Sequence, residues 1–159
     1  MQPYIGVIGP GTDVAPGTLV VALEVGRLLA GAGAVVVTGG LGGVMEAAAQ
    51  GAREAGGLTV GLLPGNRRDA ANPYLTVVIP TGLGEMRNAL LVRVCDALVA
   101  VGCSWGTLSE IALAVRTGVP VVAINCWDLP TDGPVAVPDA PAALAELRGG
   151  GLGLVGGHE

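Results

Sequence analysis

Short apolar runs alternate with longer stretches of helical periodicity along the whole chain. The apolar runs predict strands at residues 4–8, 34–37, 58–63, 75–79, 97–101 and 119–124. The stretches around them predict helices at residues 17–32, 43–55, 83–95, 107–117 and 141–148. This alternation is typical of βαβ units, so the sequence predicts an α/β fold, a Rossmann-like doubly wound parallel sheet with helices on both faces.

A single domain is predicted over residues 1–159, because no linker or repeat interrupts the alternation. The Gly-rich end, residues 153–159, is predicted to be a flexible tail, and it holds the only histidine, His158. A histidine in such a place argues against a Ser–His or Cys–His pair and against a histidine-based metal site, so we expect no metal.

Glycines gather where the predicted strands end. The residues that follow the strands are 9–13, 38–43, 64–68, 81–84 and 102–107. In a parallel sheet these carboxyl ends meet at one edge, and ligands bind beyond that edge. The sequence therefore predicts a ligand site at this rim.

The most informative segment, residues 84–114, is predicted to form helix, buried strand, small-residue turn and helix. A glycine-rich turn into a helix N-terminus binds anions, because unpaired N–H groups and the positive end of the helix dipole point the same way. Arg87 and Glu110 flank this turn, which contains Gly102, Gly106 and Thr107. The segment predicts a small phosphorylated ligand as the partner.

A second glycine-rich turn carries Gly39, Gly40, Gly42 and Gly43. It either holds phosphate or ribose with backbone N–H groups or is a tight turn without a ligand. We favour the ligand, because two such turns converge on one rim. Gly9, in the first turn, joins them. That first turn is not G-x-G-x-x-G, and no acidic residue ends the second strand, which argues against nicotinamide cofactors.

Two interpretations of Glu110 stay open. Thr107-x-x-Glu110 has the spacing of a capping box, in which the carboxylate serves the helix end. Alternatively, Glu110 faces the cleft as a general base or a stabiliser of positive charge. Arg87 lies near the start of its helix, where the dipole disfavours a cation, which indicates an anionic partner rather than a plain surface arginine. Asp96 is predicted to be a local cap or turn group.

Four more residues are possible members of the site. Glu46 either faces the rim or belongs to a solvated helical stripe. Arg67 and Arg68 either form a lid that contacts phosphate or are solvated charges. Cys103 lies inside the turn, where a helix dipole lowers a thiol pKa, but no base is near it in sequence, so a nucleophilic role is the less favoured interpretation.

Composition excludes several functions. The net charge is −5 with no basic run, which argues against a nucleic-acid partner. All eight basic residues are arginine, so no lysine can carry pyridoxal phosphate. Three cysteines without C-x-x-C spacing predict free thiols. The N-terminus is predicted to be a strand rather than a signal peptide, and the charge-free run at 28–45 contains turns, so we expect a cytoplasmic protein without a membrane partner.

Two predicted helices, 17–32 and 107–117, are apolar almost all round. A helix with so narrow a polar face is usually covered on its second side. The sequence therefore predicts a homo-oligomer, a dimer or a tetramer.

The sequence from residue 5 to about 125 resembles the lonely guy (LOG) family, often labelled "possible lysine decarboxylase". It is most similar to the short bacterial branch that resembles molybdenum-cofactor carrier proteins. The family motif P-G-G-x-G-T-x-x-E corresponds to residues 102–110, and its R-K pair, nine residues ahead of an Asp, corresponds to Arg87 and Asn88 before Asp96. The segment 39–46 (GGLGGVME) resembles the family's Gly-Gly…Gly-x-Met segment.

The departures bear on function. Cys103 and Ser104 replace the two central glycines, although the Ser104 hydroxyl can still donate to phosphate. Asn88 replaces the lysine of the phosphoribohydrolase branch. The resemblance implies a carrier-type protein that binds a nucleotide, phosphate or molybdenum cofactor at Gly106, Thr107 and Arg87 and requires no other cofactor. The alternative it implies is an enzyme that cleaves the N-glycosidic bond of a nucleoside 5′-monophosphate, with Arg87 and Glu110 as catalytic residues.

Overall fold

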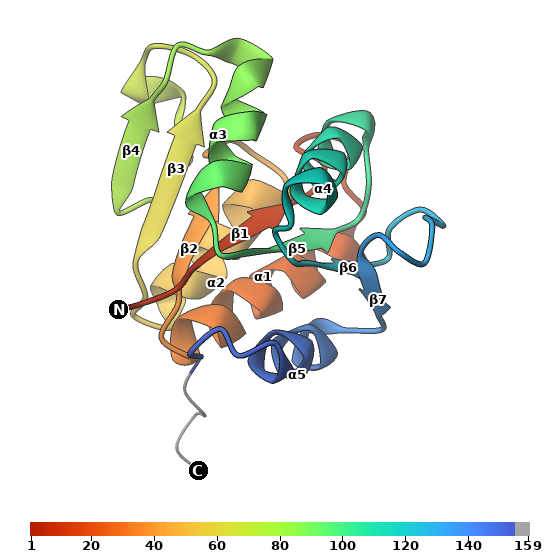
Figure 1. Ribbon diagram of the computed structural model, residues 1–159. Coiled ribbons are helices and arrows are strands. Elements are labelled where there is room, and N and C mark those ends of the chain that lie inside the picture. Colours follow the sequence, from red (N-terminus) through yellow and green to blue (C-terminus); the bar gives the residue numbers. More distant parts are fainter. Residues whose placement is uncertain (155–159) are drawn as a thin grey trace.

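The computed structural model of the protein describes residues 1–154 and contains one seven-stranded sheet (Figure 1). All paired neighbours are parallel, and the strand order is β4-β3-β2-β1-β5-β6-β7. The predicted α/β doubly wound fold is confirmed. The strands are β1 (Tyr4–Ile8), β2 (Val35–Thr38), β3 (Thr59–Leu63), β4 (Val77–Pro80), β5 (Ala97–Val101), β6 (Val121–Ile124) and β7 (Val135–Val137).

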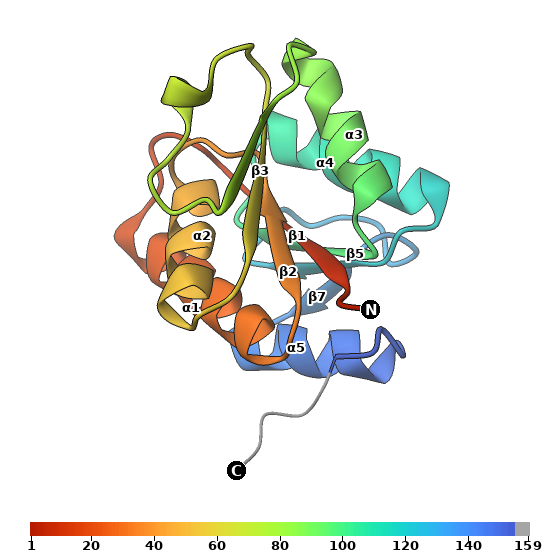
Figure 2. The same cartoon turned by 90° about the vertical axis from the view of Figure 1, so that its left-hand side faces the viewer.

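Five helices cover the two faces of this sheet. They are α1 (Pro16–Gly31), α2 (Val44–Glu54), α3 (Arg87–Val94), α4 (Trp105–Thr117) and α5 (Ala140–Gly149). Helices α1, α2 and α5 pack on one face and share a core with β1, β2, β5 and β6. Helices α3 and α4 pack side by side on the other face (Figures 1 and 2). The central strands are buried on both faces, which explains their unbroken runs of Val, Ala, Leu and Ile.

Every predicted strand and helix is present, and the differences lie at element ends. The predicted helix 83–95 begins with a 3₁₀ turn, Gly84–Met86, and becomes α-helical only at Arg87. Strand β7 was not predicted, because three largely exposed residues at a sheet edge carry no periodic signal. The predicted tail, residues 153–159, and His158 lie largely outside the described residues.

The prediction of three free thiols was wrong. Cys103 and Cys126 form a disulfide, and Cys95 is the free, buried cysteine of the described chain. Strands β5 and β6 pair in the register Val101 with Ile124, so residues two positions further on leave the sheet next to each other. The sequence gives no sign of this pairing, because 23 residues separate the two cysteines.

Part of the predicted cover for the apolar helices comes from the chain itself, because α1 packs against both α2 and α5. Large apolar side chains stay exposed at Val20 on α1 and at Trp105 and Val115 on α4. Self-association therefore stays a prediction. Over residues 1–154, none of the helices has both the length and the apolar character needed to cross a bilayer.

Candidate functional site

The strand order reverses between β1 and β5, and the chain leaves these two strands in opposite directions. In an open parallel sheet this arrangement opens a crevice beyond the carboxyl ends of the strands. A cleft of about 160 Å³ lies at this point. Its walls come from β1, from the ends of β2 and β5, and from the N-terminal parts of α2, α3 and α4. The residues that line it are Val7, Ile8, Gly9, Gly11, Gly39, Met45, Arg87, Asn88, Ser104, Gly106, Thr107 and Glu110.

Arg87 reaches into the cleft from the first residue of α3. Its Nη1 donates a hydrogen bond to the Leu62 carbonyl at 3.1 Å, which fixes the guanidinium against the end of β3. Its Nε is buried and has no hydrogen-bond partner within the described chain. Burial lowers the pKa of Arg87, and the nearby carboxylate of Glu110 partly offsets this. A buried donor without an acceptor costs roughly 1–3 kcal/mol, so an acceptor on a bound ligand would stabilise this position.

Gly39 makes room for that guanidinium group. A Cβ at this position would collide with Nη1 of Arg87 and lie 2.6 Å from Sδ of Met45. Residue 39 directly follows β2 and is buried. A glycine here lets the arginine lie flat against the backbone at the floor of the cleft.

Glu110 faces the same cleft from the second turn of α4, and only 8% of its surface is exposed. Burial raises the pKa of this carboxyl from its ordinary value of 4.5 to about 7, although the positive charge of Arg87 opposes the shift. Among residues 1–154, no ion pair within 4.0 Å joins the two groups. The cleft is therefore close to neutral when Glu110 is ionised and positively charged when it is protonated.

The N-terminus of α4 differs from the prediction. The helix begins at Trp105, and its N-cap is Ser104, whose hydroxyl accepts from the Thr107 N–H at 3.2 Å. The capping-box interpretation of Thr107 and Glu110 was therefore wrong, because Ser104 already supplies the cap. In the described chain the N–H groups of Trp105 and Gly106 remain as the open donors of this first turn.

Asn88 follows Arg87 and lines the cleft with its amide. Its Nδ2 lies 3.5 Å from the Ser109 hydroxyl, which in turn donates to the Gly106 carbonyl at 2.7 Å. Asn88 thus connects α3 to the first turn of α4 without adding a charge.

The second glycine-rich turn contributes only Gly39 to the cleft. The Gly40 N–H donates to Thr38 Oγ1, and the Val44 N–H donates to the Pro10 carbonyl. Gly43 has φ +62°, and a Cβ there would strike Pro10, so this turn is packed against the first one. Of the remaining glycines predicted for the site, Gly42 lies against Gly11, and Gly102 lies against Pro10 and Thr18.

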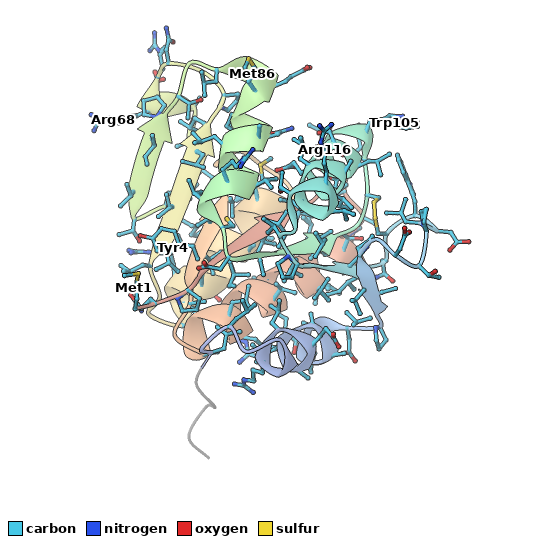
Figure 3. The ribbon with its side chains drawn as sticks, viewed as in Figure 1. Met1, Tyr4, Arg68, Met86, Trp105 and Arg116 are labelled. Carbon is cyan, nitrogen blue, oxygen red and sulfur yellow. A yellow bond between two sulfur atoms is a disulfide. The ribbon has the colours of Figure 1, made fainter. Side chains whose placement is uncertain are left out.

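The other predicted residues lie elsewhere. Glu46 lines a separate surface groove over α1 and α2. Arg67 is exposed and forms an ion pair with Asp69, and Arg68 is exposed beside β4 (Figure 3). Neither arginine lines the cleft, and Cys103 is occupied by its disulfide.

Asp96 was predicted to be a local cap or turn group, but its contact is with a residue 92 positions away in the sequence. Its Oδ2 accepts from the Tyr4 N–H at 2.8 Å. This contact joins the amino ends of β1 and β5, at the opposite edge of the sheet from the cleft.

Four residues of the cleft were not predicted: Val7, Ile8, Gly11 and Met45. Three of them belong to β1 or to its turn and look like ordinary core or turn positions. Met45 was recognisable in retrospect, because it ends the Gly-x-Met segment, and its Cε lies 3.0 Å from where a Cβ on Gly11 would be. Over residues 1–154, no three His, Cys, Asp or Glu side chains gather as a metal site would require.

The fold and the cleft define a class of protein, the single-sheet Rossmann-like α/β domains with a polar cleft at the topological switch point. The chain belongs to the SLOG cluster4 family, whose family model matches residues 2–142.

Three similar proteins illustrate this family assignment. An uncharacterized protein of Archaeoglobus fulgidus is 45% identical over 121 residues, which are 76% of this chain and 79% of the relative. The structure of the molybdenum cofactor binding protein from Rippkaea orientalis matches with a TM-score of 0.89 and 35% identity over 94% of this chain and 97% of that one. The molybdenum cofactor carrier protein of Chlamydomonas reinhardtii matches with a TM-score of 0.87 and 36% identity over 94% and 98%.

Proposed function

We propose that this protein binds a small phosphorylated ligand in the cleft between β1 and β5 and carries it without chemical change. The observation on which this rests is the half-buried side chain of Arg87, whose Nε is buried and has no acceptor among the described residues. A phosphate group supplies the missing acceptor, and charge-assisted hydrogen bonds of this kind are roughly twice as strong as neutral ones.

The residues present suit a phosphate at one end of the cleft. Arg87 provides the cation, and the first turn of α4 provides the open N–H group of Gly106 together with the helix dipole. Protonated Glu110 adds a neutral donor rather than a repelling charge. The rest of the ligand extends past Asn88 and Gly106, because both residues also line a neighbouring hollow of about 500 Å³ between α3 and α4.

The molybdenum cofactor, a phosphorylated pterin, is our first candidate ligand, and a nucleotide is the second. Two similar structures are described as a molybdenum cofactor binding protein and a molybdenum cofactor carrier protein. In this chain Arg87 and the α4 turn would hold the phosphate of either ligand. The cofactor would be cargo here, and no residue of the cleft is assigned to chemistry on it.

A second candidate function is hydrolysis of a nucleoside 5′-monophosphate. The observation that favours it is Glu110, a buried carboxyl in the cleft with a pKa of about 7, close to the value that suits a general acid or base. Glycoside cleavage normally uses two carboxyl groups, however, and Glu110 is the one carboxylate among the described residues that line the cleft. We therefore rank binding above hydrolysis.

A ligand panel tests this ranking. Pure protein is incubated with AMP, CMP, GMP and UMP and, separately, with molybdenum cofactor released from a molybdoenzyme. Retention is measured by rapid gel filtration, and released base by chromatography. We expect a retained ligand and no free base. Release of ribose 5-phosphate by the wild-type protein, abolished in Glu110→Gln, would show that hydrolysis is the function.

We also propose that the protein self-associates through its exposed apolar side chains, among them Val20, Trp105 and Val115. Their exposure in one copy of the chain supports this. Light scattering at micromolar concentration should report a mass of at least a dimer, whereas a uniform monomer of 15.6 kDa would contradict the proposal.

A further inference from the structure

The disulfide between Cys103 and Cys126 lies next to the cleft, where both cysteines pack, partly buried, against the core beneath α3 and α4. Cys103 immediately precedes Ser104, the N-cap of α4, and Ser104, Gly106 and Thr107 line the cleft. Cys126 lies in the segment that joins β6 to β7. The bond therefore ties the turn that is proposed to hold phosphate to the β6–β7 segment, which contributes none of the described residues that line the cleft.

Strand register brings the two cysteines together. Val101 on β5 is paired with Ile124 on β6, and each cysteine is two residues beyond its paired residue. Their Cα atoms are 4.8 Å apart, within the usual range for disulfides. Because the sheet fixes this proximity, the two thiols stay close after reduction and the bond can form again.

The two tryptophans of the chain lie next to this bond. Trp105, the first residue of α4, contacts Trp127 edge to face, with ring centroids 4.9 Å apart. Each tryptophan lies within two residues of one of the bonded cysteines, and both are exposed (Figure 3 labels Trp105). A change at the disulfide therefore reaches the start of α4 directly.

We propose that Cys103 and Cys126 form a reversible thiol–disulfide pair that controls the phosphate-binding turn: the oxidised protein holds its ligand, and the reduced protein releases it. The effect on ligand binding rests on the function proposed above. A cytoplasmic location, which we also propose, favours a reversible role, because disulfides there are mostly transient or redox-sensing.

The exchange step involves an external dithiol. Its thiolate attacks the sulfur of Cys126, the S–S bond breaks, and Cys103 leaves as a thiolate next to the N-terminus of α4, where the helix dipole stabilises negative charge. The second thiol of the reductant then closes its own disulfide and frees Cys126. Two electrons and two protons pass from the dithiol to the cysteines, and an oxidised dithiol reverses the reaction. Both cysteines are half-buried and can be reached by such a partner.

Reduction should weaken phosphate binding for two reasons. In the reduced protein no covalent bond holds the turn before Ser104 to the β6–β7 segment, so the N–H groups of this turn are held less firmly in position. A thiolate at Cys103 also places negative charge beside the phosphate. Both effects act in the same direction.

Cys95 provides the matched control. It is buried under α3, and burial raises its thiol pKa well above the ordinary value, with Asp96 and Glu110 adding to the shift. Cys95 should therefore stay unreactive in the native protein. Cys95→Ala removes this thiol and leaves the proposed pair intact.

Hydrogen exchange of the wild-type protein in oxidising and in dithiothreitol buffer tests the switch without any ligand. Thiol titration after unfolding should count one thiol in the oxidised protein and three in the reduced protein. The Thr107 and Leu108 amides, which donate to the Ser104 hydroxyl and carbonyl, should exchange at least about fivefold faster after reduction. Cys126→Ala should show the fast exchange in both buffers, and Cys95→Ala should behave like the wild type.

Inorganic phosphate, titrated into the same two states, tests the effect on binding. Affinity should fall by about 5- to 10-fold on reduction. Equal exchange rates and equal phosphate affinity in both states would overturn the proposal, as would a response to dithiothreitol that persists in Cys126→Ala. Absence of phosphate binding in both states would instead contradict the proposed function, while the exchange comparison still decides whether the pair controls the turn.

Discussion

Arg87→Ala should weaken binding of the phosphorylated ligand by about 1.5–3 kcal/mol, or roughly 10- to 150-fold, the contribution of a hydrogen bond to a charged group. Arg87 is the single cation among the described residues that line the cleft, so no neighbour can replace it. Isothermal titration calorimetry with the ligand retained from the panel measures the change. Arg93→Ala is the matched control, because Arg93 is exposed on the same helix and should leave the affinity unchanged.

A second variant tests whether Arg87 must also be correctly placed, and not only present, for the ligand to bind. Gly39→Ala keeps the arginine but places a Cβ where its guanidinium group now lies. The obstructing atoms belong to the end of a flexible side chain, so the fold should survive while Arg87 is displaced and affinity falls. Gly31→Ala, at the end of α1 with no atom within 4 Å of the new Cβ, is the control. Normal ligand affinity in both Arg87→Ala and Gly39→Ala would show that Arg87 does not bind the ligand.

Glu110→Gln should make the protein more stable at pH 8 and should remove most of a pH dependence that the wild type shows. The folded-state pKa of Glu110 is about 7, above the ordinary value of 4.5. The native state therefore binds the proton of Glu110 more tightly than the unfolded state does. The stability that this protonation gives the folded protein is complete below pH 4.5 and is lost as the pH rises to about 7. This difference between the folded and unfolded pKa values corresponds to a loss of about 3 kcal/mol in the free energy of unfolding once Glu110 is fully ionised.

Thermal unfolding from pH 4 to pH 8 measures this effect. The wild-type midpoint should fall across that range, and the Glu110→Gln midpoint should vary less. Glu85→Gln, which changes an exposed carboxylate near α3, is the control and should keep the wild-type slope. Parallel curves for wild type and Glu110→Gln would refute the buried, protonatable state of Glu110.

The same titration has a consequence for binding. Ionisation of Glu110 cancels the charge of Arg87, so sulfate affinity of the wild type should decrease as pH rises through 7. Sulfate is a suitable probe because, unlike phosphate, it does not titrate in this range. The affinity of Glu110→Gln should stay constant.

The sequence predicted the sheet and its helices well because the central strands are buried on both faces. Strand β5, for example, is a continuous apolar run with every residue buried, and its bounds agree with the prediction. Strand β7 and the 3₁₀ turn before α3 were not predicted, because short, exposed elements depend on tertiary contacts rather than on periodicity.

The site was predictable as far as it depends on the edge of the sheet at which the parallel strands end. Arg87, Glu110 and the turn at Gly106 meet in the cleft because parallel strands end at one edge. The sequence could not show that Gly40 and Gly43 do not line the cleft, because only three-dimensional packing shows that their turn lies against Pro10. The cysteine pair was also hidden, because it depends on the register of β5 and β6.

A crystal structure of the protein with the ligand retained from the panel tests the central claim most directly. The account predicts an intact ligand whose phosphate oxygens accept hydrogen bonds from Arg87 and from the Gly106 N–H in the cleft between β1 and β5. A phosphate bound elsewhere, or a cleaved sugar phosphate with its base gone, would contradict the account.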